Sequence, residues 1–524
     1  MSREWDAKAW GSVLGVRTVR QSRAESRNGR ARLRSVAPPG RDSTMSWFYR
    51  SVMLCVASGL SVAELRAAKA VEGTREVGQI YAEFCSGCHG DDLAGGKAGS
   101  LIDAKWEHGA DDDQLARSIL DGYPAEGMPG FRGAIKDAEV LALVAYIREV
   151  ATREVDPQPA EEALLPRGVL KSEEHAFRLE VVAEGFDVPW SLTFLPEGRM
   201  LVTERVGRLR VIENGRLKDE PVRGLPESIL VRDEAGLMSV VAHPEYAENG
   251  WIYLSFSDHG PNETAMTKVI RGRLRDGALV GQENVFAIPP SDYQQSSVLF
   301  GGRLAFHDEY LFISVGERGM EEFTTGAAQD LAVPNGKIHR VYHDGSVPPD
   351  NPFARQPGKF GSIWAYGVRN PQGLAINEAG EVWETEHGPR GGDELNRIER
   401  GKNYGWPVVT RGMNYNGTPV SEKKEAEGME NPVIDWTPSI AASQIEFYRG
   451  DKFPRWKGQL FVGSLAQQKF LRVVVEGTRV VHYEEVFQRL GRIRDIKTGP
   501  DGMIYLAIER IGKLGMIVRM VPAD

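Results

Sequence analysis

The sequence predicts two folds in one chain: a small all-α domain followed by an all-β propeller of six blades. Apolar residues recur at helical spacing before about residue 150. After about residue 175, the pattern changes to strand–turn–strand units with alternating apolar residues. The proline-rich, acidic segment Glu154–Arg167 lies between the two patterns and is typical of a spacer. A chain of 524 residues is also too long for one compact core.

The N-terminal region has the pattern of a secretory signal peptide. Met45 is followed by Arg50, the apolar run 51–63 and a cleavage site of small residues. The run is too short to span a membrane as a helix. We therefore expect residues 45–70 to be removed on export to the periplasm or medium, with no transmembrane anchor left. The arginine-rich residues 1–44 are expected to lie upstream of the true start; a disordered basic extension is the alternative.

Net charge and cysteine content limit the classes of partner and the kind of scaffold that we expect. The formal net charge of −9 gives no reason to expect a nucleic acid or an anionic membrane as partner. The three cysteines exclude a disulfide-stapled scaffold, and one of them, Cys55, falls inside the predicted signal peptide.

Residues 71–152 are expected to form the first domain, and they carry a haem attachment motif. Cys85-Ser86-Gly87-Cys88-His89 is a C-x-x-C-H sequence, in which two thiols bond the haem vinyl groups and the histidine binds the iron. A redox disulfide would not require His89, and a zinc site would need further cysteine or histidine ligands. The sequence therefore predicts a c-type haem attached to Cys85 and Cys88, with His89 on the iron.

Met128 is the predicted second iron ligand. It lies in Gly127–Phe131, a loop bounded by glycine and proline that can hold a thioether toward the iron. The amphipathic segment Lys136–Val150 follows as a predicted helix. With a helix before the haem motif, a methionine loop and a final helix, the segment resembles class I cytochromes c over nearly all of its length.

Residues 176–524 are expected to form the propeller, after a linker at 153–175. About six strand–turn–strand units recur at irregular spacing, which is typical of four-stranded blades arranged radially. The units are 191–204, 238–256, 302–317, 373–386, 444–464 and 495–509. A β-sandwich is the alternative, but six similar hairpins favour radial repetition. Propellers bind ligands on loops at one end of the central channel.

The loop Thr385–Asn396, TEHGPRGGDELN, combines a histidine, carboxylates and glycines. Carboxylates and bare backbone carbonyls are the ligands that calcium prefers. Together with YGVRNPQG, GKNYGWP, GSVPPDNPF and GRIRDIKTGPDG, this loop resembles the soluble quinoprotein aldose and glucose dehydrogenases, including their glucose/sorbosone dehydrogenase relatives. The resemblance runs from about Gly185 to the C-terminus. It implies a six-bladed propeller that uses calcium and pyrroloquinoline quinone (PQQ).

The resemblance implies roles for individual residues. Arginines hold the PQQ carboxylates as bidentate, permanently charged partners, and calcium polarises the carbonyl that receives hydride. The implied PQQ contacts are Arg369, Asn370, Gln372, Arg492 and Arg494. The implied calcium ligands are the backbone carbonyls of Gly388 and Pro389, with Asp393, Glu394 and Tyr404 at a further, structural calcium site. Hydrogen bonding that stabilises the loop is the alternative role for this last set.

Three positions depart from the pattern of the family. Leu299 stands where the family has its general-base histidine, Glu234 where it has a glutamine beside the substrate, and Ala466 where it has a lysine directed at the cofactor. Leucine cannot accept a proton, so a catalytic propeller needs another base. The candidates are Glu234, Glu317 and His387.

The sequence therefore favours a PQQ-dependent sugar or alcohol dehydrogenase with a fused haem. A sugar, polyol or aldehyde hydrate would lose hydride to PQQ, and electrons would pass through the haem to an external cytochrome or quinone chain. Tethering raises the effective concentration of the haem as acceptor. Two other hypotheses stay open: a propeller with lost or altered catalysis that only binds a ligand for the cytochrome, and a calcium-dependent hydrolase such as a lactonase.

Overall fold

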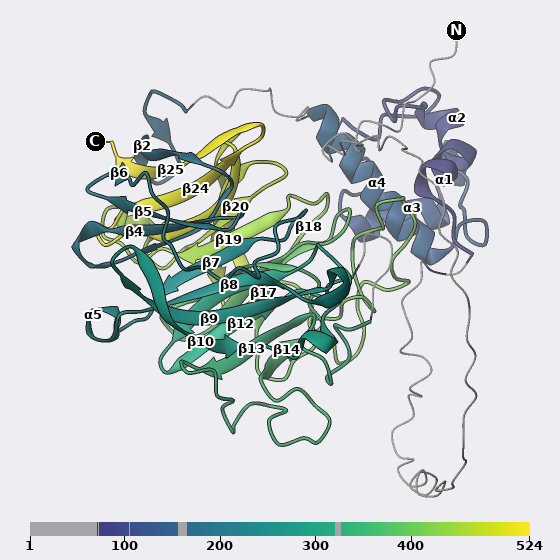
Figure 1. Cartoon of the computed structure of the whole chain (residues 1–524). Coiled ribbons are helices and arrows are strands. Elements are labelled where there is room, and N and C mark those ends of the chain that lie inside the picture. Colours follow the sequence, from purple (N-terminus) through teal and green to yellow (C-terminus); the bar gives the residue numbers. More distant parts are fainter. Residues whose placement is uncertain (1–70, 72, 104, 156–164, 320–325, 524) are drawn as a thin grey trace, which may run out of the picture. The chain divides into compact units, whose positions relative to one another are not determined.

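The structure is a computed structural model in which two regions of different architecture are resolved (Figure 1). It describes residues 71, 73–103, 105–155, 165–319 and 326–523. The predicted signal peptide at 45–70, the segment 1–44 and residues 156–164 of the predicted linker lie outside the described residues. Among the described helices, none is both long and apolar enough to cross a membrane.

The first region is all-α, as predicted. Its helices are α1 (Val77–Phe84), α2 (Ser86–His89), α3 (Asp112–Asp121) and α4 (Asp137–Val155), with a 3-10 turn at Pro124–Glu126. Ile80 of α1, Leu115 of α3 and Leu143 of α4 are buried in one apolar core. The predicted helix at 136–150 is present as α4, which continues to Val155.

The second region consists of six antiparallel sheets, and the predicted six-bladed propeller is confirmed. Blade 1 is β3 (Pro189–Phe194), β4 (Met200–Glu204), β5 (Arg208–Glu213) and β6 (Arg216–Leu217); blade 2 is β7 (Leu237–Ala242), β8 (Trp251–His259), β9 (Ala265–Arg275) and β10 (Ala278–Phe286). Blade 3 is β11 (Gly301–His307), β12 (Tyr310–Val315), β13 (Lys337–Tyr342) and β14 (Ile363–Tyr366); blade 4 is β15 (Pro371–Ile376), β16 (Val382–Glu386), β17 (Asp393–Ile398) and β18 (Ile434–Trp436). Blade 5 is β19 (Ala442–Phe447), β20 (Leu460–Ser464), β21 (Lys469–Glu476) and β22 (Arg479–Gln488). A short helix, α5 (Tyr246–Asn249), lies between β7 and β8.

The sixth blade closes the ring with strands from both ends of this region. It contains β23 (Arg492–Thr498), β24 (Ile504–Arg510) and β25 (Lys513–Pro522), completed by β2 (Ala176–Phe186) and β1 (Leu170–Lys171). Leu179 of β2 pairs with Met520 of β25 in antiparallel register. The first strands of the blades contact one another in the order β3, β7, β11, β15, β19 and β23, and β23 contacts β3 again. This closure leaves fewer unpaired strand edges.

The blades are held together by apolar side chains between neighbouring sheets. The ring of Trp383 on β16 is fully buried and lies 6.0 Å from the ring of Phe447 on β19 in the next blade. Because each sheet is covered on both faces, inner strands such as β12 are apolar along nearly their whole length. Removal of such an aromatic side chain typically costs about 3–5 kcal/mol of the free energy of unfolding.

The topology brings the candidate residues to one end of the propeller. In an antiparallel blade, the start of the first strand and the turn between the second and third strands lie at the same end of the sheet. Glu234, Leu299 and Arg369 precede the first strands β7, β11 and β15, and Gly388 lies in the turn between β16 and β17. Residues more than a hundred positions apart in the chain therefore share one face.

Candidate functional site

The C-x-x-C-H motif lies where α1 meets α2. Cys85 follows α1, Cys88 and His89 lie in α2, and both thiols are free. The Nδ1 atom of His89 lies 2.9 Å from the backbone oxygen of Gly99. A hydrogen bond donated by Nδ1 fixes the tautomer and leaves Nε2 available for a metal. The geometry of the histidine therefore suits an iron ligand.

The turn that carries Met128 packs against the region of this motif. Phe131, three residues after Met128, contacts Phe84, the residue before Cys85, edge-on with ring centroids 5.7 Å apart. Other apolar side chains of the same core are only partly buried, and they include Leu101, Ile102, Trp106 and Leu120. A flat apolar group such as a haem could cover them. The residues present thus fit a c-type haem.

In the propeller, the backbone of Leu299 holds a carboxylate. The Glu234 Oε2 atom accepts a hydrogen bond from the Leu299 N–H at 2.8 Å, and the Glu234 N–H donates to the Ser297 carbonyl at 3.2 Å. The Leu299 side chain is buried, and its backbone has a φ of 56°, in the left-handed region. The Leu299 backbone therefore anchors an exposed glutamate.

A buried arginine fixes the backbone on which this contact depends. The guanidinium of Arg318 donates hydrogen bonds to the carbonyls of Ser296 and Val298 and lies 3.3 Å from the centre of the Phe300 ring. Burial lowers the pKa of Arg318 to about 9, and the nearby Glu234 carboxylate partly opposes this shift. Arg318 thus supports the loop that holds Glu234.

Three arginines surround one carboxylate at the same end. Arg492 and Arg494 lie 3.2 and 2.6 Å from the Glu509 carboxylate. Burial, followed by repulsion from Arg494, lowers the pKa of Arg492 to about 10 and also lowers that of Arg205. One glutamate does not balance three arginines. The group therefore suits a ligand with several carboxylates.

Arg369 contacts one of the two carbonyls expected to bind calcium, that of Gly388. Its Nη1 atom donates to the His387 carbonyl at 2.8 Å and to the Gly388 carbonyl at 3.0 Å. Asn370 and Gln372 form a neighbouring pair, with Gln372 donating to the Asn370 side-chain oxygen at 3.1 Å. In this arrangement Arg369 occupies a carbonyl that a cation would use, so cation binding requires the guanidinium to turn toward another partner.

His387 is a poor base in this environment. The residue is partly buried, and its Nε2 atom is buried without a hydrogen-bond partner among the described residues. Burial, followed by repulsion from Arg369, Arg494 and Arg492, lowers the pKa of His387 to about 3. The ring is therefore neutral at ordinary pH and offers a hydrogen bond rather than proton uptake.

Asp393 is used to hold the loop together. Its carboxylate accepts hydrogen bonds from the Gly388 N–H at 2.9 Å, the Ser439 hydroxyl at 2.7 Å and the Ala442 N–H at 3.1 Å. The hydroxyl of Tyr404 accepts from the Glu399 N–H at 2.8 Å. These bonds engage the Asp393 carboxylate and the Tyr404 hydroxyl with the protein itself.

Three glutamates are buried beside this loop. Glu384 and Glu394 both accept hydrogen bonds from the Asn396 amide, at 2.9 and 3.0 Å, and Glu386 lies near them. Burial raises the pKa of Glu394 to about 7 and raises those of Glu384 and Glu386, and repulsion between carboxylates adds to the shifts. Glu386 and Glu394 line a small cavity with His387 and Gly388. A cation would offset the repulsion.

Glu317 and Ala466 are the last two positions that were singled out from the sequence. The buried Glu317 carboxylate accepts a hydrogen bond from the Trp406 indole at 2.6 Å, and its N–H donates to the Arg369 carbonyl at 2.8 Å. It therefore positions Trp406. Ala466 is exposed in the turn between β20 and β21 and offers no charge.

The sequence interpretation missed four charged residues of this end: Arg205, Arg318, Glu384 and Glu509. Arg205 follows β4 and Glu509 lies in β24. Glu384 carried a signal that could have found it, because it is an acid in the middle of the strand VWETE, where both faces are buried.

Comparisons with known proteins follow the same division of the chain. The sequence profile of the family described as Glucose / Sorbosone dehydrogenase matches residues 186–519, and that of Cytochrome C oxidase, cbb3-type, subunit III matches residues 72–147. The chain is similar to Aldose sugar dehydrogenase YliI of Escherichia coli (strain K12), with 41% identity over 345 residues, which is 64% of this chain and 91% of that protein.

Two solved structures resemble the propeller. The soluble aldose sugar dehydrogenase from Escherichia coli in the apo-form has a TM-score of 0.60 at 38% identity, covering 66% of this chain and 100% of that chain. The PQQ-bound form of aldose sugar dehydrogenase from Streptomyces coelicolor has a TM-score of 0.53 at 25% identity, covering 69% of this chain and 99% of that chain.

Proposed function

Because the chain belongs to the glucose/sorbosone dehydrogenase family and carries a cytochrome c domain before the propeller, we propose that it is an exported quinoprotein dehydrogenase with a fused electron acceptor. The proposed substrate is a sugar, polyol or aldehyde hydrate. The proposed cofactors are PQQ, calcium and a c-type haem, and an external cytochrome or quinone chain is the final acceptor. The observation that carries the proposal is the arginine group beside Glu234 at one end of the propeller.

The arginine group would hold the carboxylates of PQQ. Arg492 and Arg494 supply charge that Glu509 alone does not balance, and Arg205 adds a third cation. When bound, PQQ would supply a hydride acceptor, and the haem would supply one-electron transfer. The neutral His387 would donate or accept a hydrogen bond beside them.

Glu234 is the proposed general base. Its carboxylate is anchored at the Leu299 N–H, at the position of the lost histidine, and it would accept the proton of the substrate hydroxyl. Its exposure lets that proton pass on to water. Glu317 is bonded to Trp406 and His387 is a weak base, so these two residues support the site instead.

Calcium is proposed at two places. The carbonyls of Gly388 and Pro389 would hold the ion beside PQQ, once Arg369 turns toward the cofactor. A structural ion would be held by Glu394 together with Glu384 and Glu386, while Asp393 and Tyr404 shape the surrounding loop. Both proposals rest on the excess of oxygen ligands in blade 4.

The haem would be attached to Cys85 and Cys88, with His89 and Met128 as iron ligands. The bond between His89 Nδ1 and the Gly99 carbonyl supports this, because it directs Nε2 outward. A propeller that only binds a ligand is the second candidate function, and the observation that favours it is the buried, aprotic Leu299 side chain.

An assay of dye reduction tests the catalytic proposal. The chain from Val71, produced with haem and supplied with calcium and PQQ, would be offered sugars, polyols and aldehydes with an artificial electron acceptor. We expect at least one substrate to reduce the dye only when PQQ is present, and Glu234→Gln to lower that rate. Glu227→Gln, which changes an exposed carboxylate elsewhere, is the control. PQQ binding without turnover of any substrate would favour the binding module.

A further inference from the structure

We propose that His108 is a positioning residue for Met128. The inference rests on the proposed haem site, in which Met128 is the second iron ligand. Its basis is a contact between His108 and the turn that carries Met128, at two separate points of that turn.

Besides His108, the turn is supported by its own backbone bonds and by a hydrogen bond between the Tyr123 and Ser118 hydroxyls at 3.1 Å. Tyr123 and Met128 close it, with the Tyr123 N–H donating to the Met128 carbonyl at 2.8 Å and the Met128 N–H donating to the Tyr123 carbonyl at 3.2 Å. Gly127 has a φ of 92°, and nothing lies within 4 Å of the position a Cβ atom would take there. Exposed turns of this kind open at low cost in free energy.

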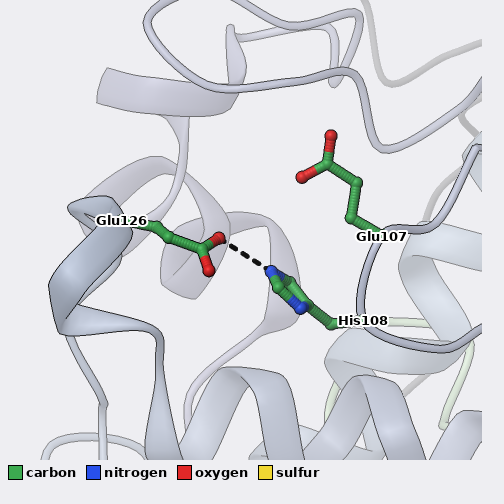
Figure 2. Close-up of side chains that lie close together, drawn as sticks. All are labelled: Glu107, His108 and Glu126. Carbon is green, nitrogen blue, oxygen red and sulfur yellow. Dashed lines mark hydrogen bonds and ion pairs between the residues drawn. The ribbon is translucent and has the colours of Figure 1, made fainter.

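His108 holds the turn at two points, both of which precede Met128 in the chain. Its imidazole stacks on the Tyr123 ring, with centroids 3.6 Å apart and planes inclined by 17°. Its Nε2 atom lies 2.9 Å from the Glu126 Oε2 atom, and Figure 2 shows the ring directed toward this carboxylate. Tyr123 precedes and Glu126 belongs to the 3-10 turn just before Met128. One side chain therefore restrains the backbone that leads into Met128 at two points.

The segment that carries His108 is itself fixed. Gly109 has a φ of 102°, and a Cβ atom there would lie against the side-chain oxygen of Gln114, which accepts a hydrogen bond from the backbone N–H of Asp111, the cap residue of α3. Arg148 of α4 bonds the Asp112 carboxylate at 3.0 Å. His108 thus links the methionine turn to α3 and α4, and its loss should free the turn without unfolding the helices.

Exogenous imidazole measures this effect directly. Imidazole binds ferric haem only when Met128 leaves the iron. The apparent affinity of the haem for imidazole therefore rises with the fraction of molecules in which the turn is open. We expect His108→Ala to raise that affinity about three- to tenfold and to weaken the sulfur-to-iron charge-transfer band. His108→Phe and Glu126→Gln both keep a ring stacked on Tyr123 and change only the contact between residues 108 and 126. Each variant should therefore give an intermediate rise in the affinity for imidazole. These two variants also carry the test if His108→Ala fails to retain haem.

Glu107→Gln is the matched control. Its carboxylate lies within 4.8 Å of the same ligand atoms, yet Figure 2 marks no bond to it. Unchanged imidazole affinity in every His108 variant, with the charge-transfer band intact, would overturn the positioning role. A wild-type haem without that band would overturn the assignment of Met128 and, with it, this inference. Both readouts use the haem alone, so they are independent of PQQ and of the dehydrogenase proposal.

Discussion

The carboxylate of Glu234 accepts a hydrogen bond from the backbone N–H of Leu299 at 2.8 Å. This contact joins two positions that are expected from the sequence to depart from the family pattern. If Glu234 is the base, Glu234→Gln should lower kcat by about 10²–10⁴-fold. The isosteric amide keeps the volume, so the affinity for PQQ should stay within about twofold. Steady-state kinetics and a PQQ titration measure the two effects separately.

The contact between Glu234 and Leu299 also predicts that a histidine at position 299 restores part of the activity lost in Glu234→Gln. Leu299 has a left-handed backbone, which histidine adopts more readily than most residues. Leu299→His in the Glu234→Gln background should recover part of the lost kcat, whereas Leu299→Met should not. Equal kcat values for the two double variants would argue against a proton-accepting role at this position.

Removal of one arginine should weaken PQQ binding. Arg492→Met deletes a partly buried charge at the proposed PQQ site, and bonds to charged groups contribute about 1.5–3 kcal/mol. The dissociation constant of PQQ should therefore rise by about 10–100-fold, measured by fluorescence quenching. Arg519→Met, which removes a surface arginine paired with Glu180, is the control and should leave the constant unchanged.

The buried glutamates of blade 4 predict a calcium effect that depends on pH. Burial raises the pKa of Glu394 to about 7 in the folded chain, from an ordinary value of 4.5. A raised carboxyl pKa favours folding fully below about pH 4.5, and this contribution is lost as the pH rises through about 7. Calcium offsets the repulsion of the ionised form. The rise in Tm on adding calcium should thus be larger at pH 8 than at pH 5, by about 2 °C or more.

Substitution of Glu394 tests whether the effect of calcium on Tm is larger at the higher pH. Glu394→Gln should remove most of the difference between the two pH values, measured by thermal unfolding with calcium and with a chelator. Glu378→Gln, on the exposed turn between β15 and β16, should retain it. A calcium effect of equal size at both pH values would contradict the proposed ligands.

The sequence predicted features that depend on neighbours in the chain. The spacing of Cys85, Cys88 and His89 is by itself enough to predict haem attachment. The recurring hairpins predicted six blades, which the structure confirms. Each feature is local, because a helix turn or a strand pair is defined by a few consecutive residues.

Residues that act through distant partners could not be predicted in this way. Arg205, Arg318 and Glu509 belong to three different blades, and only ring closure brings them to one end. Likewise, the role of the Leu299 backbone could be recognised only from its hydrogen bond to Glu234 in the structure. Loop-to-loop contacts of this kind depend on the curvature and register of all six sheets.

The most direct test of the account is substrate-driven reduction of the fused haem. With calcium and PQQ bound, mixing with a substrate should reduce the haem in a first-order phase whose rate does not change on tenfold dilution of the protein, because the acceptor is tethered. Without PQQ, or in Glu234→Gln, this phase should be absent or at least about 10²-fold slower. A haem that stays oxidised with PQQ bound and every substrate class offered would contradict the dehydrogenase account.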